Sequence, residues 1–381
     1  MYLLFFYITV NNNYTRFVAV LLLEFRSDIL LKMLSFMRCG SFSNVGLSAV
    51  LKQSTNGGFS LESIRLFATR SYRSAGQAVR RKTLKEVLTQ PATETPFFAG
   101  KLAVAGGAAL SIGALCYYGL GLSSESGILE QSMLWPEYVR NRVHSTYQYL
   151  GGSLLLTTAS AMAVARTPFI MNILTRNSVL VSKSDVKLTF SHGMFGTMAA
   201  LIGTGAVCQS IAYDKAKLDA KHIAWALHCG TLGAVIAPLS FLGGPLLIRA
   251  ACYTAGVVGG LSAVAVCAPN EKFLNMGGVL AMGLGIVFAS SIGTFFLPPT
   301  TMLGASMYSV VTYGGLVLFS GFLLYDTQRV VKMAEHYPTY ALKPFDPINA
   351  QIGIYLDTIN IFMRIAMILA SGGGGGGNRR R

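Results

Sequence analysis

The chain has 381 residues, of which 52% are hydrophobic and only 12% are charged. Soluble proteins carry about 25% charged residues, so this composition excludes an ordinary water-soluble domain and indicates a membrane protein. The formal net charge is +15. A basic excess can indicate nucleic-acid binding, but here much of it falls in the N-terminal region and the tail. A targeting sequence and the loops on one side of a membrane account for it better, and we expect no nucleic-acid partner.

The N-terminal part has two expected sections. In residues 1–32, neither of two apolar runs reaches the roughly 20 residues that span a bilayer, and Met33 opens a more coherent start, so we expect an upstream extension here. The stretch Met33–Lys82 is rich in arginine and serine and carries one acid, Glu62. This pattern is typical of a mitochondrial transit peptide, which we place at residues 33–72, with cleavage after Phe67 or Tyr72. A disordered basic arm is the alternative.

After a basic matrix segment at residues 73–101, eight apolar runs follow one another. They are Leu102–Leu122, Val143–Ala165, Leu188–Tyr213, His222–Leu242, Leu246–Ala268, Phe273–Leu297, Leu303–Asp326 and Ile348–Ala370. Each is long enough to cross a bilayer as a helix, and their recurring glycines and alanines favour close helix packing in lipid. The sequence therefore predicts an all-α fold, a polytopic membrane helix bundle over residues 102–371, and a glycine-rich basic tail at residues 372–381.

Two aspartates stand out within these runs. Asp326 ends the seventh run, and Asp357 lies well inside the eighth. An ionised carboxylate at the centre of a membrane helix costs roughly 2.5–3.5 kcal/mol by insertion scales, so both need an explanation. If the two helices pack together, a shared proton or a cation could hold the carboxylates side by side. The simpler alternative for Asp326 is a helix cap at the water interface.

The motifs around these aspartates resemble the transmembrane Bax inhibitor motif family. They are Tyr325-Asp326-Thr327-Gln328 and Tyr355-Leu356-Asp357-Thr358-Ile359-Asn360-Ile361-Phe362, with further similarity in Leu242–Ala251, Glu271–Gly277 and Phe296–Thr301. The resemblance implies seven family helices plus one added N-terminal helix, Leu102–Leu122, as in the family's mitochondrial member. It also implies that Asp326 and Asp357 form a pH-sensing pair in a calcium leak or exchange pathway, where they would bind calcium transiently. Some members place a glutamate in an early helix, but this chain has no acid in Val143–Ala165 or Leu188–Tyr213.

Four further residues are candidates for supporting the pair. Arg364 and Asn360 follow Asp357 on the same helical face, so they could extend a polar stripe into the bundle. For Arg364 the alternative is a side chain that snorkels to the interface, and Arg249 fits such an interfacial position better than an interior one. His228 could relay protons, although a structural, hydrogen-bonded histidine is the more common case. Pro238, in the same run as His228, predicts a helix kink.

Other chemistry finds little support in the sequence. The six cysteines show no Cys-x-x-Cys spacing, so we expect neither a disulfide framework nor a zinc site. There is no nucleophile elbow, zinc-protease motif or phosphate-binding loop, and we therefore expect no enzyme and no cofactor. The counts of basic residues in alternate loops predict that the mature N-terminus and the C-terminus both face the matrix.

Two functional hypotheses remain. The first is a protein of the mitochondrial inner membrane that passes calcium, in exchange for protons or as a pH-gated leak, through the two aspartates, with inner-membrane lipid, calcium and protons as its partners. The resemblance to the mitochondrial member adds a role in cristae organisation and apoptosis control. The second is a non-transporting scaffold for cristae and cytochrome c retention, which would contact cytochrome c and inner-membrane complexes.

Overall fold

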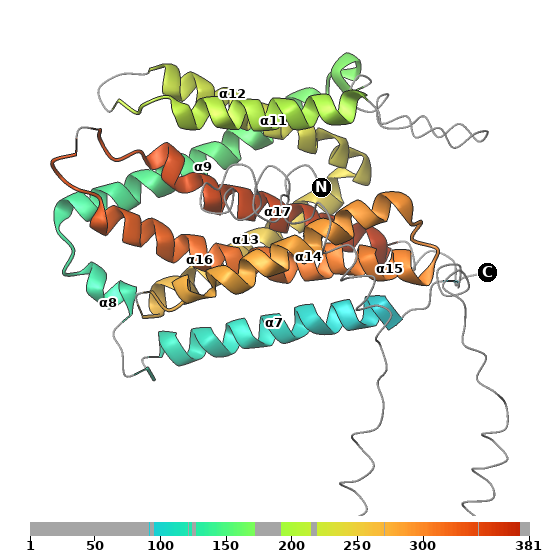
Figure 1. The fold of residues 1–381 in the computed structure, drawn as a ribbon, viewed down its shortest axis with the longest axis horizontal. Coiled ribbons are helices and arrows are strands. Elements are labelled where there is room, and N and C mark those ends of the chain that lie inside the picture. The colour runs from blue at the N-terminus through green and yellow to red at the C-terminus, as the bar shows by residue number, and fades with distance from the viewer. Residues whose placement is uncertain are drawn as a thin grey trace, which may run out of the picture. The chain divides into compact units, whose positions relative to one another are not determined.

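The computed structural model describes residue 91 and residues 95–120, 122–123, 127–171, 192–214, 219–269, 271–341 and 343–373. Within these ranges the chain is helical, with two isolated bridge pairs and no extended strand (Figure 1). The α-helices are α7 (Thr95–Gly119), α8 (Ile128–Ser132), α9 (Glu137–Ala165), α11 (His192–Ser210), α12 (Ala220–Ile236), α13 (Gly244–Cys267), α14 (Gly277–Phe296), α15 (Met302–Ser309), α16 (Gly315–His336) and α17 (Pro347–Gly373). Two 3-10 segments, Ala237–Leu242 and Leu274–Met276, and a π-helix, Val310–Gly314, complete the order.

Six helical segments in the described residues are long and apolar enough to cross a membrane. They are Thr95–Gly119, Ala220–Leu242, Gly244–Cys267, Leu274–Thr294, Met302–His336 and Pro347–Ser371. The other two expected runs are also helical: they correspond to α9, with 29 residues, and α11, with 19. The predicted all-α, polytopic membrane bundle is therefore confirmed.

Three helices extend past the limits of the segments expected from the sequence. Helix α7 begins at Thr95, so residues 95–101 belong to it and not to the basic segment. The seventh run continues past Asp326 to His336, because polar residues lengthen the helix beyond its apolar part. Helix α17 includes the first two glycines of the expected tail. The predictions for residues 1–32 and 33–72 lie outside the described residues.

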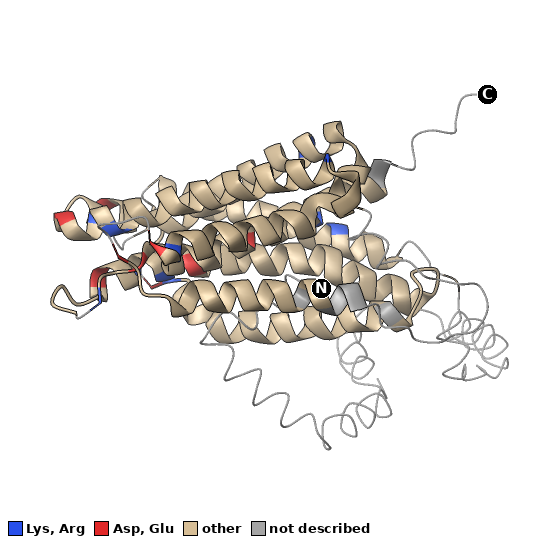
Figure 2. Ribbon diagram, turned by 90° about the horizontal axis from the view of Figure 1, so that it is seen from above, with Lys and Arg blue, Asp and Glu red and all other residues tan. Residues whose placement is uncertain are grey.

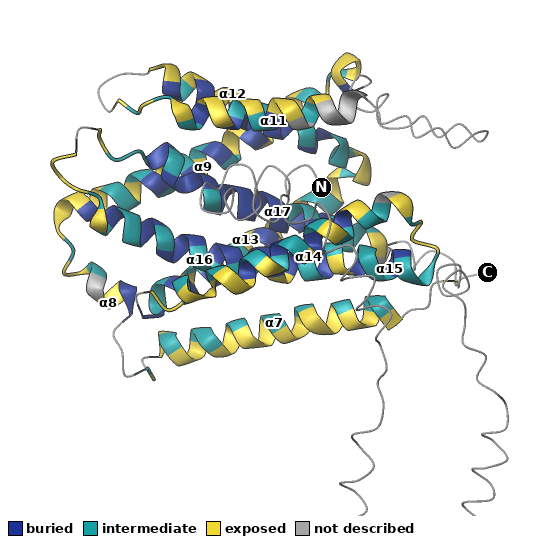
Figure 3. Cartoon of the chain, viewed as in Figure 1, coloured by how far each residue is buried: buried dark blue, intermediate teal, exposed yellow. Residues whose placement is uncertain are grey.

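Helices α16 and α17 form the centre of the packing. Helix α17 contacts α9, α13 and α16. Two thirds (67%) of the residues in its most apolar stretch are buried inside the protein. Figure 3 shows this contrast with α7, which contacts α13 and α15 but has no buried residue. The exposed apolar side chains of α7 are suited to lipid contact, whereas α16 and α17 are shielded from it.

Local chemistry explains several helix ends. The Asp219 side chain accepts a hydrogen bond from the N-terminal backbone of α12, and His222 completes a capping box. At the other end of this run the α-helix ends at Ile236, and Pro238 falls in the 3-10 segment that follows, since proline has no backbone N–H to donate. Gly243 then turns the chain into α13 with a φ of 94°, a left-handed conformation that favours glycine.

Charged residues gather near the ends of the helices (Figure 2). We call the end where α16 finishes and α17 begins the α16–α17 end. The order of the helices brings these acidic residues to it: Glu130, Glu137, Asp214, Asp219, Glu271, Glu335 and Asp346. One of them, Glu271, lies 2.6 Å from Lys332, which lowers the pKa of the Glu271 carboxyl. Of the acids that the structure describes, only Asp326 and Asp357 lie within the bundle.

Candidate ion site

Asp326 and Asp357 lie on the two central helices. Asp326 is 2% exposed on α16, and Asp357 is fully buried on α17, which packs against α16. A β-carbon placed on Gly353 would overlap the Asp326 carboxylate, so this carboxylate lies directly over the α17 backbone. Gly353 precedes Asp357 by one helical turn on the same face. The two carboxylates therefore belong to one buried patch between α16 and α17.

The alternative in which Asp326 caps a helix at the water interface does not hold. Its side chain is buried in the middle of α16, which runs on to His336. The Asp326 Oδ1 atom lies 3.6 Å from the Arg329 guanidinium, one turn toward the α16–α17 end. That guanidinium is partly exposed, so it places a positive charge between the carboxylate and the end of the helix.

A polar stripe follows α17 through the bundle. Asn349, Gly353, Asp357, Asn360 and Arg364 recur at spacings of three and four residues, which places them on one helix face. At 1.5 Å per residue the stripe is about 22 Å long, most of the thickness of a bilayer core. Residues of this face contact α16 at Gly353 and at Arg364. Polar residues therefore follow one face of α17, which meets α16 at Gly353 and Arg364 and meets α11 and α12 at Asn349.

Arg364 ends this stripe inside the protein. It is 4% exposed and donates hydrogen bonds to the Asn360 Oδ1 atom at 2.9 Å and to the Val311 carbonyl oxygen at 3.3 Å. Its guanidinium also lies 4.4 Å from the centre of the Phe319 ring. The snorkelling alternative for Arg364 is therefore wrong, because the side chain turns toward α16 and not toward the interface.

The partner of Arg364 is an irregular segment of backbone. Val311 belongs to the π-helix between α15 and α16, and such one-turn π segments often occur at functional sites. Gly315 follows the π-helix, and a β-carbon there would overlap the Arg364 guanidinium. The missing side chains at Gly315 and Gly353 thus let one charged group from each helix lie against the backbone of the other.

A cavity leads from the α16–α17 end to Asp326. Its volume is about 510 Å³, and it is lined by Gln209, Asp326, Arg329, Val330, Met333, His336, Tyr337, Pro338, Phe345, Asp346, Asn349, Ala350, Ile352, Gly353 and Leu356. Asp326 of α16 and Gly353 and Leu356 of α17 line its inner end, and Tyr337 and Phe345 come from the connection between the two helices. This cavity gives the buried Asp326 carboxylate a route toward solvent.

Arg142 of α9 binds the connection between α16 and α17, which forms part of the cavity wall. It donates hydrogen bonds of 2.9 Å to the carbonyl oxygens of Ala334 and Tyr337, at the end of α16. Its guanidinium also lies 4.9 to 5.6 Å from the ring centres of Tyr138, Tyr337 and Phe345. Such contacts between a cation and aromatic rings stabilise a loop by roughly 0.5–2 kcal/mol each. The cavity wall is therefore an ordered part of the fold.

The other predicted supporting residues lie elsewhere. His228 is buried on α12, where its Nδ1 atom lies 3.1 Å from the Thr204 hydroxyl of α11. This hydrogen bond favours the structural interpretation of His228 over the proton relay. Arg249 is exposed near the start of α13, consistent with an interfacial position and not with the stripe.

Sequence reasoning missed Lys221, which directly precedes the run that begins at His222. Its side chain is fully buried and pairs with Asp346 at 2.8 Å. A lysine at a helix start normally reaches water, so no local pattern distinguishes this one. Gly353 and Gly315, against which Asp326 and Arg364 pack, were also missed, because glycines are frequent in every run.

The site offers two buried carboxylates as its negatively charged oxygen donors. Among the described residues, no group of three or more histidine, cysteine, aspartate or glutamate side chains could hold a metal ion. Two carboxylates with nearby amide and backbone oxygens are hard ligands of the kind that Ca²⁺ prefers, but a tight calcium site has six to eight oxygens. The fold and this interface define a polytopic helical membrane protein with an acidic pair in its core.

Comparison with known proteins is consistent with this class. The family described as "Inhibitor of apoptosis-promoting Bax1" matches residues 139–374, and the chain belongs to this family. Growth hormone-inducible transmembrane protein of Rattus norvegicus is 53% identical over 311 residues, which cover 81% of this chain and 86% of the rat protein. Bax inhibitor 1 of Homo sapiens is 30% identical over 142 residues, 37% of this chain and 51% of the human protein.

A more distant match is bacterial. An uncharacterized protein of Helicobacter pylori (strain ATCC 700392 / 26695) is 25% identical over 252 residues, 65% of this chain and 94% of that protein. No solved structure matches the chain significantly. The family match begins at residue 139, within α9, so α7 lies outside it.

Proposed function

We propose that this protein resides in the mitochondrial inner membrane and passes calcium through the site of Asp326 and Asp357, in exchange for protons or as a pH-gated leak. The observation that carries the proposal is the cavity whose inner end is lined by Asp326, Gly353 and Leu356. It brings solvent to one carboxylate of a buried pair. Buried ionisable groups in membrane helices usually belong to ion or proton pathways.

The polar stripe suggests how the protein would handle charge. With a proton on the pair, the carboxylates can lie close together between α16 and α17. When both are ionised they repel each other, and a divalent cation from the cavity can neutralise them. Since two carboxylates offer fewer oxygens than a tight calcium site, the cation is released again.

Arg364 sets the far limit of this site. Arg364 follows Asp357 by two helical turns on the same face of α17, and its guanidinium is bound to Asn360 and to the π-helix. A fixed positive charge there repels a cation that has passed the aspartates. We propose that onward passage requires Arg364 to leave the Val311 carbonyl, and that the π-helix allows this movement.

The predicted orientation gives the cavity a side of the membrane. If the mature N-terminus faces the matrix, alternate crossing places the α16–α17 end in the intermembrane space. Calcium would then enter the cavity from that space and leave toward the matrix, or take the reverse path. The mitochondrial location itself depends on the composition of Met33–Lys82.

Calcium flux in reconstituted vesicles tests the proposal. The full chain should carry calcium, and the variant with both Asp326→Asn and Asp357→Asn should not, since the amides keep the size but lose the charge. Glu130→Gln is the matched control, because Glu130 is an exposed acid at the same end of the bundle. Flux that survives in the double variant would contradict transport through this pair and favour the scaffold hypothesis.

The proposal includes a role in apoptosis control and cristae organisation. Relatives named Bax inhibitor 1 connect the family with apoptosis by name. We infer that cristae organisation and apoptosis control depend on this chain through calcium handling. Cells that carry only the double asparagine variant should then lose normal cristae, whereas a scaffold would keep them intact.

A further inference from the structure

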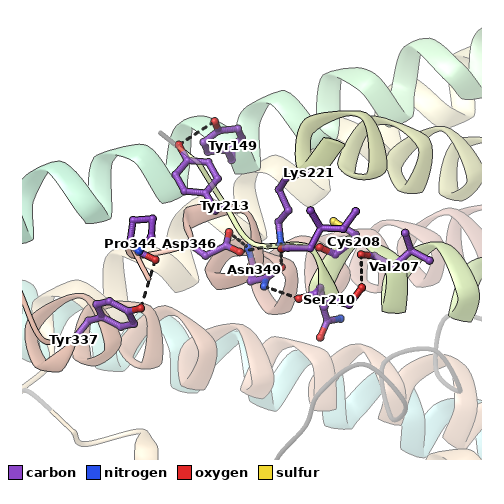
Figure 4. Close-up of polar contacts among 12 residues, drawn as sticks. Tyr149, Val207, Cys208, Ser210, Tyr213, Lys221, Tyr337, Pro344, Asp346 and Asn349 are labelled. Carbon is purple, nitrogen blue, oxygen red and sulfur yellow. Dashed lines mark hydrogen bonds and ion pairs between the residues drawn. The ribbon is translucent and has the colours of Figure 1, made fainter. Parts of the chain in front are cut away.

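Lys221 is a buried lysine that the proposed pathway does not use. It lies in the first turn of α12 with a fully buried side chain, among the largest buried side chains of the described residues. Burying an ammonium group without partners costs several kcal/mol, so its surroundings must be strongly favourable. Figure 4 shows how the side chain reaches between α11, α12 and the start of α17.

Four oxygen atoms surround the Lys221 ammonium. They are the carbonyl oxygens of Cys208 at 2.6 Å and Ile211 at 3.1 Å, the Asn349 Oδ1 atom at 2.8 Å and the Asp346 Oδ2 atom at 2.8 Å. We call these four oxygens the oxygen cage. An ammonium has three protons to donate, so four close oxygens exceed its hydrogen-bonding capacity. The arrangement resembles the coordination shell of a cation more than a set of directed hydrogen bonds.

The chemical composition of the oxygen cage supports the same interpretation. One carboxylate, one side-chain amide and two backbone carbonyls are the hard oxygen donors that bind cations such as Na⁺ and Ca²⁺ in proteins. The negative charge of Asp346 balances the single positive charge of Lys221. A monovalent cation in place of the ammonium would keep this balance, and a divalent cation would leave one excess positive charge.

The oxygen cage is reachable from the cavity. Asp346 and Asn349 supply two of its four oxygens, and both residues line the cavity, as does Gln209. Asn349 is also anchored from both sides, because its amide donates to the Gln209 carbonyl at 3.3 Å and its backbone N–H donates to Asp346 at 3.0 Å. These bonds hold Asp346 and Asn349, which supply two of the four cage oxygens, in place independently of Lys221. A cation in the cavity therefore has access to the cage oxygens of Asp346 and Asn349.

We propose that the oxygen cage is a second cation-binding site, which the chain fills with its own ammonium group and which a hard cation from the cavity occupies when Lys221 withdraws. The site is separate from the aspartate pair, and binding there does not require that the protein transports calcium. Lys221 acts in it as a tethered competitor, which raises the cation concentration needed to fill the cage.

Replacing the competitor tests this proposal. Lys221→Met keeps an apolar stem of similar length but leaves the cage without a cation. The melting temperature of the purified full chain is measured in detergent with tetramethylammonium chloride as the reference salt, because its cation is too large for the cage. In the titration, NaCl or CaCl₂ replaces part of this salt at constant ionic strength. For Lys221→Met we expect a saturable rise in melting temperature of about 5 °C, from ligand linkage at concentrations well above the dissociation constant. The wild-type protein should respond much less.

Two controls separate the cage from other charges. The variant with both Lys221→Met and Asp346→Asn should lose the response, because the cage no longer carries a negative charge. Lys332→Met removes a lysine from the ion pair with Glu271 at the same end and should respond like the wild type. Repeating the titration in an Asp326→Asn, Asp357→Asn background removes the other acidic site, and the response of Lys221→Met should persist there.

The outcomes decide the proposal in either direction. A Lys221→Met protein that folds only when Na⁺ or Ca²⁺ is present during purification also supports it. A Lys221→Met protein that melts at the same temperature with and without these cations, or that fails to fold under both conditions, shows that no diffusible cation fills the cage. An equal response of the Lys221→Met, Asp346→Asn variant would likewise overturn it.

Discussion

Gly353→Ala most directly perturbs the contact between the Asp326 carboxylate and the backbone of α17. The new methyl group would overlap the Asp326 carboxylate, which must then rotate or push α16 away from α17. Overpacking of this kind costs about 1–3 kcal/mol, and displacing a buried polar group adds about 1–3 kcal/mol. The higher helix propensity of alanine offsets at most about 1 kcal/mol of this destabilisation. We expect a net loss of about 1–5 kcal/mol.

Thermal melting of the purified protein measures this loss. A change of 1 kcal/mol corresponds to about 2–4 °C in a domain of comparable size, so the melting temperature should fall by several degrees. Gly256→Ala on α13 is the matched control, because no atom lies near its added methyl group, and it should be neutral or stabilising. In an Asp326→Ala background the cost of Gly353→Ala should largely disappear. If Gly353→Ala costs the same in both backgrounds, Asp326 does not lie over this glycine.

Three further predictions concern location, topology and the far end of the stripe. A reporter fused to Met33–Lys82 should enter mitochondria and be shortened, and a full-length cytosolic reporter would contradict the targeting prediction. Protease added to mitoplasts should leave a tag after Arg379–Arg381 intact, whereas digestion of that tag would mean an inverted orientation or an odd number of crossings. Arg364→Gln should increase calcium leak in vesicles at unchanged protein content, because it removes the fixed positive charge. Unchanged or lower flux would refute the barrier that we assign to this arginine.

Length and hydropathy were sufficient to predict the fold class. Each apolar run corresponds to a helix, since in a membrane the backbone must pair within the segment. The ends were less predictable, as at α16, because polar side chains extend a helix into water without any change in apolar pattern. The π-helix could not be predicted either, because Val310–Gly314 has no local signature.

The buried charges were predicted only where they interrupt an apolar run. Asp357 and Arg364 stand out for this reason, and spacing alone places Asn360 between them. Lys221 lies just outside an apolar run and does not stand out there. Its burial could not be predicted, because its partners Asp346 and Asn349 are far away in sequence. Gly353 and Gly315 could not be distinguished from other packing glycines, since only the three-dimensional contact shows which charged side chain each of them accommodates.

The pH dependence of calcium flux in vesicles tests the central claim most directly. If Asp326 and Asp357 share a proton and bind calcium when ionised, wild-type flux should rise with pH over the range in which the pair loses that proton. Asp326→Asn and Asp357→Asn should each flatten this dependence, because one remaining carboxylate cannot repel a partner. Asp357→Lys should be more damaging than the asparagine variant, since it buries an ammonium that repels the cation. Single asparagine variants that keep the wild-type pH profile would contradict the account.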